Sequence, residues 1–232
     1  MEGKNSEENL DVFLSKDSKK IYENLRGQAI YICSQWKVFS ELFVESKETI
    51  DLLNEYAPEG FWIIQESMAD DLKSKINRLI DNKKTGKYEH STIEQLIECI
   101  KSDLEKNGFQ EVFKEFEKKW EEIKIFREDK HFRKERNERI SHLDLNKVLN
   151  DKIIKLRNPE DIKKLIELLS DFFQLFNIKF FNADFHLTHP PNISISGLIY
   201  VLEIYREFKD LAKKKDKNAS EVFFRILKQR NN

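Results

Sequence analysis

Apolar residues recur along most of the chain at intervals of three, four and seven positions, which is the spacing of amphipathic α-helices. The helices that the sequence predicts span about 19–44, 47–53, 58–79, 93–104, 109–139, 148–156, 162–181, 195–213 and 222–227. Most of these helices are long and their connections are short. The pattern therefore predicts an all-α protein built as a helical bundle.

Local signals mark several of the predicted helix ends. Ser46 precedes a short apolar run and is expected to be an N-cap, and Pro58 fits the first turn of the helix that follows. Residues 91–94 have the Ser-x-x-Glu form of a capping box. The pair Asn107 and Gly108 is typical of a helix end, so one helix is expected to stop there.

The domain organisation follows from these elements. Residues 1–18 are polar and are expected to be flexible or briefly helical, and residues 19–185 form the predicted bundle. Residues 186–232 start with a proline-containing loop and continue as a C-terminal helical extension, which we expect to pack on the same domain. No repeat and no Gly-Ser linker divides the chain.

Composition narrows the class of protein. The chain is 39% hydrophobic and 36% charged, and its 41 basic residues balance 42 acidic ones. Balanced charge together with 12% aromatic residues is typical of a folded chain rather than a disordered one. Six glycines and four prolines are too few for the frequent turns of an all-β sandwich or barrel.

The apolar runs and the net charge bear on location and partners. No run approaches the roughly 18 residues of a membrane-spanning helix, and the polar N-terminus lacks the apolar region of a signal peptide, so we expect a cytoplasmic protein without membrane contact. Cys33 and Cys99 cannot form a zinc site alone, and no disulfide is required. The net charge of −1 argues against a strong nonspecific grip on nucleic acid but leaves a local basic site open.

The strongest candidate for chemistry lies near the end of the helix predicted over 109–139. Arg136, Asn137, Arg139 and His142 follow one another there, with five residues between Arg136 and His142. A guanidinium group holds a phosphate through two parallel hydrogen bonds, and an imidazole exchanges protons near neutral pH. Such a set fits the binding of a phosphodiester and the transfer of a ribose hydroxyl proton, which needs no metal ligand.

The same residues also fit a solvated helix end. Cations near a helix C-terminus interact favourably with the helix dipole, and Glu135 lies one turn before Arg139, where the two form an ordinary ion pair. On a straight helix Arg136 and His142 lie about 120° apart. For both to act on one phosphate, the helix must end or bend near Ile140, or a second chain must supply one of them.

The stretch resembles the Arg-polar-x-His signature of HEPN domains, in which four to six residues separate the arginine from the histidine. Its surroundings are similar to the abortive-infection U-like branch, in which the stretch reads like Arg-Asn/Asp-x-Arg-Ile-Ala-His-x-Asp. The likeness covers roughly residues 20–180. The segments that carry it are Trp36 to Phe43, Leu52-Leu53-Asn54, Ala57-Pro58, Phe61-Trp62 with Gln65, residues 77–81, residues 92–96 and residues 136–144.

The resemblance implies a HEPN-type helical bundle with additional C-terminal helices, which forms a homodimer and brings Arg136 and His142 into a groove between two protomers. Many HEPN proteins are metal-independent endoribonucleases of toxin–antitoxin, abortive-infection and other antiphage systems. We therefore expect an RNA-cleaving effector of phage defence without a cofactor. His142 would be its acid–base residue and Arg136 its phosphate binder, with Asn137 and Arg139 orienting the substrate or stabilising charge.

The alternative is a non-catalytic HEPN module that binds RNA, a nucleotide or a protein partner such as an antitoxin. The near-neutral charge of the chain and the pairing of Glu135 with Arg139 favour this interpretation. Arg78 and Asp81, three residues apart at a predicted helix end, are auxiliary candidates. Arg78 would reach the same groove and Asp81 would orient it, or the two form a local ion pair worth under about 1 kcal/mol.

Three further features are open to two interpretations. Basic residues outnumber acidic ones over 124–139 and 206–230, which fits a phosphate-tracking face or solvated helix faces. The aromatic stripe over 109–120 fits base stacking, but its helical spacing favours a core or dimer interface. Asp184, His186 and the nearby His189 are too few for a metal site, and none is expected.

Overall fold

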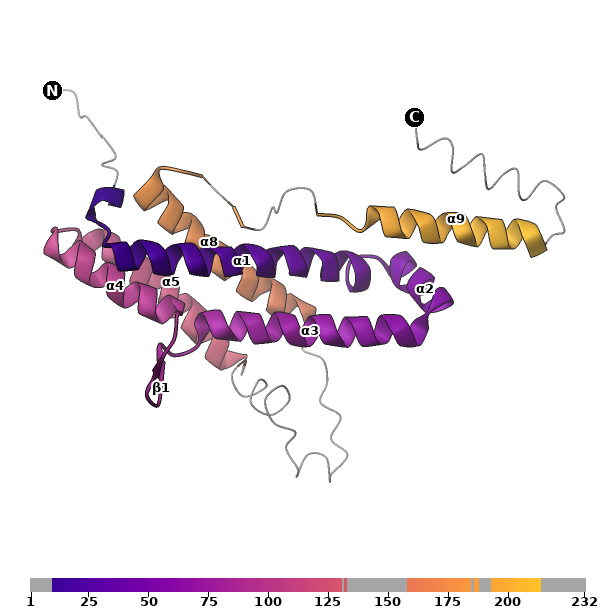
Figure 1. Cartoon of the computed structure of the whole chain (residues 1–232), viewed down its shortest axis with the longest axis horizontal. Helices are drawn as coiled ribbons and strands as arrows, with labels where there is room; N and C mark the ends of the chain where they lie inside the picture. Colours follow the sequence, from indigo (N-terminus) through magenta and orange to yellow (C-terminus); the bar gives the residue numbers. More distant parts are fainter. Residues whose placement is uncertain (1–9, 131, 133–157, 185, 188–192, 214–232) are drawn as a thin grey trace. The chain divides into compact units, whose positions relative to one another are not determined.

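The structure is a computed structural model that describes residues 10–130, 132, 158–184, 186, 187 and 193–213 (Figure 1). Its elements are η1 (Leu10–Phe13), α1 (Lys16–Phe43), α2 (Lys47–Tyr56), α3 (Pro58–Ile80), β1 (Lys84–Thr85), β2 (Tyr88–Glu89), α4 (Ile93–Lys106), α5 (Gln110–Asp129), α8 (Pro159–Phe181) and α9 (Ser196–Lys213). The predicted all-α class is confirmed. None of the described helices is long and apolar enough to cross a membrane.

The helix ends follow local capping chemistry. The Ser46 side chain caps α2 by accepting a backbone N–H bond at 3.1 Å, and α3 begins at Pro58, both as predicted. The start of α4 differs by one residue from the predicted capping box. Thr92, not Ser91, is the N-cap, and its Oγ1 accepts a hydrogen bond from the Gln95 backbone N–H at 3.3 Å. A hydroxyl at either position suits a cap, so the sequence pattern does not separate the two.

A small β-hairpin replaces the polar loop that the sequence predicts between α3 and α4. Thr85 pairs with Tyr88, and the two residues between them form the turn. Gly86 has a φ of 60° at the first turn position. A type II′ hairpin turn places glycine at this position, because other residues are strained at positive φ.

Helix α5 ends at Asp129, short of the predicted end at Arg139. Lys130 is the C-cap, and Phe132, two residues on, is helical again. Its side chain is 1% exposed, and its ring lies 6.2 Å from that of Phe126. The helix is therefore interrupted at Lys130, and the chain buries the Phe132 side chain just beyond the break.

Contacts divide the chain into two compact units. Unit 1 comprises residues 1–36 and 67–191, and unit 2 comprises residues 37–66 and 192–232. Each of the helices α1 and α3 contributes residues to both units. The packing of residues 186–232 on one domain with the bundle stays a prediction.

The core of unit 1 is rich in phenylalanine where α5 packs between α4 and α8. Phe116 of α5 contacts the rings of Phe172, Phe176 and Phe180, and all four side chains are fully buried. Tyr22 joins α1 to α8. Its ring stacks on Phe176 at 3.9 Å, and its hydroxyl donates a 2.7 Å hydrogen bond to Asn177. Burial raises the pKa of Tyr22 to about 12, so the hydroxyl keeps its proton.

Unit 2 is held by polar and aromatic contacts between α2 and α9. The rings of Tyr56 and Tyr205 meet edge to face at 5.4 Å, and Lys209 forms an ion pair with Glu55 at 3.2 Å. The Ile195 backbone N–H, just before α9, donates a 2.9 Å hydrogen bond to Glu41 of α1. These contacts connect α9 to helices that lie far away in the sequence.

Candidate functional site

The predicted site residues fall into two groups. Arg78 and Asp81 lie in the described part of the chain. The other five lie outside the described residues, and they are Glu135, Arg136, Asn137, Arg139 and His142. The structure therefore bears on the auxiliary part of the predicted site, and the arrangement of Arg136 and His142 stays a prediction.

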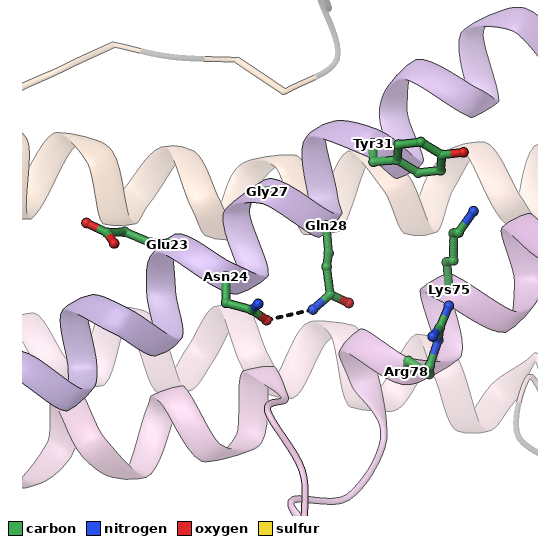
Figure 2. Close-up of a pocket in the computed structure, with 7 residues that line it drawn as sticks. All are labelled: Glu23, Asn24, Gly27, Gln28, Tyr31, Lys75 and Arg78. Carbon is green, nitrogen blue, oxygen red and sulfur yellow. Dashed lines mark hydrogen bonds between the residues drawn. The ribbon is translucent and has the colours of Figure 1, made fainter.

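A pocket of about 620 Å³ lies beside Arg78 within unit 1 (Figure 2). Its lining residues come from one face of α1 and the last two turns of α3. They are Glu23, Asn24, Gly27, Gln28, Tyr31, Lys75 and Arg78. This volume falls in the range of small-molecule sites, which is roughly 300–1,000 Å³.

Two cations share one end of the pocket. Arg78 and Lys75 lie one turn apart on α3, and Figure 2 shows both side chains toward the end of the pocket where Tyr31 lies. Arg78 is exposed, and in the described ranges no carboxylate forms an ion pair with it. Asp81, three residues on, accepts a 3.0 Å hydrogen bond from the Asn82 backbone N–H. The guanidinium group is thus open to an anion from solution.

Lys75 is held in place by three contacts. It forms an ion pair with Asp71, and its Nζ lies 4.1 Å from the centre of the Tyr31 ring. It also donates a 3.4 Å hydrogen bond to Gln35, whose amide in turn donates to Asp71 at 2.9 Å. The network connects α1 to α3 and fixes a positive charge above an aromatic face.

The middle of the pocket presents amide groups. The Gln28 side-chain N–H donates a 2.7 Å hydrogen bond to the Asn24 carbonyl oxygen (Figure 2). That bond leaves the Asn24 N–H groups as donors and the Gln28 carbonyl oxygen as an acceptor. Glu23 lies at the far end from the two cations in Figure 2. The pocket therefore has the Glu23 carboxylate at one end, amide groups in the middle, and Arg78 with the Lys75–Asp71 ion pair at the other end.

The C-terminal end of α3, which carries Arg78, is anchored by Arg127 of α5. The Arg127 guanidinium donates a hydrogen bond to the Ile80 carbonyl oxygen, and it also bonds Glu128 at 3.0 and 2.7 Å. Arg127 is 8% exposed, although its position in a basic run suggested a surface residue. The signal for burial was present, because Arg127 follows Trp120 and Ile123 on the apolar stripe of its helix.

The described residues bear on the basic run, the aromatic stripe and the Asp184–His186 loop, which the sequence left open to two interpretations. Over 124–130, Lys124, Arg127 and Lys130 all pair with carboxylates, so in this part of the run their charges are balanced locally. The aromatic stripe over 109–120 belongs to the core. His186 lies 3.5 Å from Asp184. Among the described residues, no three His, Cys, Asp or Glu side chains are grouped to hold a metal ion.

The Asp71 carboxylate makes the network pH-dependent. Partial burial alone would raise its pKa, but the hydrogen bonds from Lys75 and Gln35 and the charges of Lys75 and Arg78 lower it below its ordinary value. A lowered folded-state pKa gives stability that is present above the unfolded pKa of about 4 and is lost as the pH falls through the folded value. We expect Asp71→Asn to lower the free energy of unfolding by under about 1 kcal/mol at neutral pH.

That loss should shrink as the pH falls below about 4, because the wild-type carboxylate then becomes neutral as well. Urea unfolding of both proteins across this pH range measures it, with Asp51→Asn on α2 as a control at an exposed carboxylate. A difference between wild type and Asp71→Asn that stays constant with pH would contradict the ionic role of Asp71.

Comparison with known proteins follows the resemblance seen in the sequence. A HEPN family model with the description AbiU2 matches residues 15–196, which is more than half of the chain. The matched region includes the pocket, the end of α3 and the stretch from Arg136 to His142. No curated protein and no solved structure matches the chain.

Proposed function

Since the chain belongs to the AbiU2 family of HEPN-domain proteins, an abortive-infection family of phage defence, we propose that it acts in that role as a metal-independent endoribonuclease. The observation that carries the proposal is that the Arg136-x5-His142 stretch lies inside the matched region. The pocket beside Arg78 adds support, because it offers an exposed arginine in the same region.

In this proposal His142 acts as the base. Its neutral imidazole takes the proton of a ribose 2′-hydroxyl, and the 2′-oxygen attacks the adjacent phosphorus. The bond from phosphorus to the 5′-oxygen of the next nucleotide breaks, and that oxygen takes up the proton that His142 received from the 2′-hydroxyl. The products are a 2′,3′-cyclic phosphate and a 5′-hydroxyl. Arg136 binds the phosphate and stabilises the charge that develops on its oxygens, and Asn137 and Arg139 orient it.

A homodimer completes the proposed site. Arg136 and His142 lie about 120° apart on a straight helix, so a second copy that places its own stretch opposite the first brings the two groups to one phosphate. Symmetric dimers are the commonest assemblies of such chains. An antitoxin or another protein partner that covers this groove would hold the enzyme inactive until infection.

The test is cleavage of labelled RNA in EDTA by the purified wild-type protein and by Arg78→Ala. We expect the wild type to cut RNA and Arg78→Ala to cut about tenfold more slowly, because a hydrogen bond to a charged group is worth roughly 1.5–3 kcal/mol. Arg78 is exposed, so its loss leaves the melting temperature almost unchanged. Lys84→Ala, at an exposed lysine of the hairpin, is the matched control and is expected to cut like the wild type.

The outcomes of the cleavage test distinguish the nuclease from the non-catalytic module. Cyclic phosphate ends on the products, and resistance of an RNA with 2′-O-methyl groups, support the proposed chemistry. Intact RNA together with tight RNA binding overturns the nuclease and favours the non-catalytic module. Expression that slows growth of the host for the wild type, but not for a variant at His142, supports an active toxin.

A further inference from the structure

Helix α9 of unit 2 keeps an apolar stripe exposed in the part of the chain that the structure describes. Leu198, Val201 and Tyr205 are spaced three and four residues apart, so their side chains lie along one side of the helix. They are 44%, 58% and 50% exposed, although the Tyr205 ring meets that of Tyr56. Contiguous exposed apolar side chains mark a surface that another element or molecule covers.

The apolar arc of α9 is too wide for one neighbouring helix. Leu202 and Leu211 mark its two edges, and because they are nine residues apart they lie about 180° around the helix from each other. A helix that faces a single core usually has an apolar stripe of about 100°. Ile204 is buried, and α2 supplies one neighbour through Tyr56. The sequence of α9 therefore has room for a second neighbour on the exposed stripe.

The segment 214–232, which follows α9 directly, carries an apolar pattern that fits this stripe. It lies beyond the described residues, and its sequence predicts a helix with one apolar face. The apolar residues expected on that face are Val222, Phe223, Ile226 and Leu227.

The length of the connection allows this segment to turn back along α9. Val222 comes nine residues after Lys213, the last residue of α9, and nine residues span up to about 30 Å when extended. Tyr205 lies eight residues before Lys213, or about 12 Å back along the helix. The segment can therefore reach the exposed stripe of its own chain as the second helix of a helical hairpin.

Charge also favours unit 2 as the surface for this segment. Residues 214–232 contain six basic and two acidic residues, a net charge of +4. Residues 37–66, which belong to unit 2, contain two basic and seven acidic residues, a net charge of −5. Lys209 of α9 already pairs with Glu55 of α2 at 3.2 Å. Opposite net charges attract the segment to this part of the chain.

We propose that residues 214–232 dock on the Leu198, Val201 and Tyr205 stripe of α9 in the same chain, beside α2, and complete unit 2. The docked segment buries the apolar stripe and brings its basic side chains near the carboxylates of residues 37–66. The basic run over 206–230, which the sequence left open to two interpretations, then serves the folding of unit 2 and does not track phosphates. The proposal is independent of the nuclease.

A second exposed apolar group of unit 2 fits the segment less well. Trp62, Ile63 and Ile64 of α3 are also exposed, at 63%, 57% and 44%. They are consecutive, so on a helix their side chains spread over about 200° and do not form one stripe. This group makes Ile63 a matched control, because Ile63 and Val201 are almost equally exposed.

Cross-linking in the full-length protein tests the docking. One variant carries Val201→Cys with Ile226→Cys, and the control carries Ile63→Cys with Ile226→Cys. Cys99, which is partly exposed, is replaced by serine in both, whereas Cys33 is buried and stays. Equal amounts of ¹⁵N-labelled and unlabelled protein are mixed and treated with a short bismaleimide, and the linked peptides are identified by mass spectrometry.

We expect the Val201 pair to give about tenfold more linked peptide than the Ile63 pair, because docking holds the two cysteines together while the tether alone acts on both pairs. The links should join peptides of the same isotope, since the docking is within one chain. Links between labelled and unlabelled peptides would assign the stripe to a second copy and overturn the proposal. Equal yields from the two pairs, or no link in either, would overturn it as well.

Trypsin cleavage after Arg225 gives a second readout with single variants. A docked segment is cut only while it is detached, so the rate of cleavage follows the detached fraction. We expect Val201→Ser to be cut after Arg225 about fivefold faster than the wild type, because apolar contact is lost, and Ile63→Ser to be cut at the wild-type rate. Slow cleavage after Lys101 of α4 in all three proteins shows that unit 1 stays folded. Equal cleavage after Arg225 in all three contradicts the docking.

Discussion

Replacing His142 by alanine is expected to slow RNA cleavage by about 10²–10⁴-fold, the usual contribution of a general acid–base group. The methyl side chain of alanine cannot take the 2′-hydroxyl proton, so the attacking oxygen stays protonated and weakly nucleophilic. RNA binding should be retained, because Arg136 and Arg78 still hold phosphate. The measurement is single-turnover cleavage of a labelled RNA in EDTA, with binding followed separately by fluorescence anisotropy.

His186→Ala is the matched control for this variant. His186 is exposed and contacts Asp184 and Gln174, and it lies outside the predicted site. We expect it to cleave like the wild type. Equal cleavage by His142→Ala and the wild type would show that any activity comes from a contaminant or from another residue. The pH profile adds a second readout, because the wild-type rate should rise through the pKa of a histidine, near 6.5 in the absence of perturbation.

The sequence predicted those parts of the fold that local chemistry decides. The apolar stripes placed the helices, and Ser46 and Pro58 marked two of their ends correctly because a cap or a first turn depends only on its neighbours. The early end of α5 at Asp129 was not predicted. No proline or glycine lies between Arg127 and Phe132, so the local sequence gives no signal for the break at Lys130.

In the candidate site, too, the sequence predicted single residues but not what depends on packing. Arg78 was found from the sequence as an auxiliary residue near a helix end, and the structure places it in a pocket. The pocket itself was not predicted, because it requires two helices whose sequences lie about fifty residues apart to lie side by side. Gln28 and Tyr31 look like ordinary surface positions of α1 until α3 supplies Lys75 opposite them.

Arg127 connects the stability of the fold to this site. Its guanidinium holds the Ile80 carbonyl oxygen, and Arg78 lies only two residues before Ile80 on the same last turn of α3. The final carbonyl groups of a helix have no partner within the helix, so an external donor there limits fraying of the last turn. A change at Arg127 should therefore affect both the free energy of unfolding and the position of Arg78.

Arg127→Ala is expected to lower the free energy of unfolding by about 2–4 kcal/mol, because it removes a charged hydrogen bond, leaves the Ile80 carbonyl oxygen unpaired and opens a cavity. For a chain of this size the melting temperature falls by roughly 5–12 °C. Arg127→Met should recover part of the loss, since methionine refills the space but cannot donate. Thermal and urea unfolding measure both variants, and RNA binding in the His142→Ala background reports on Arg78.

Lys124→Ala provides the comparison on the same helix. Lys124 is also basic and also pairs with a carboxylate, Glu121, but the pair is at the surface, so its loss should cost under about 0.5 kcal/mol and leave RNA binding unchanged. If Arg127→Ala costs no more than Lys124→Ala, the hydrogen bond to Ile80 does not hold the end of α3. If Arg127→Ala destabilises the protein but binds RNA normally at low temperature, Arg127 supports the core and does not position Arg78.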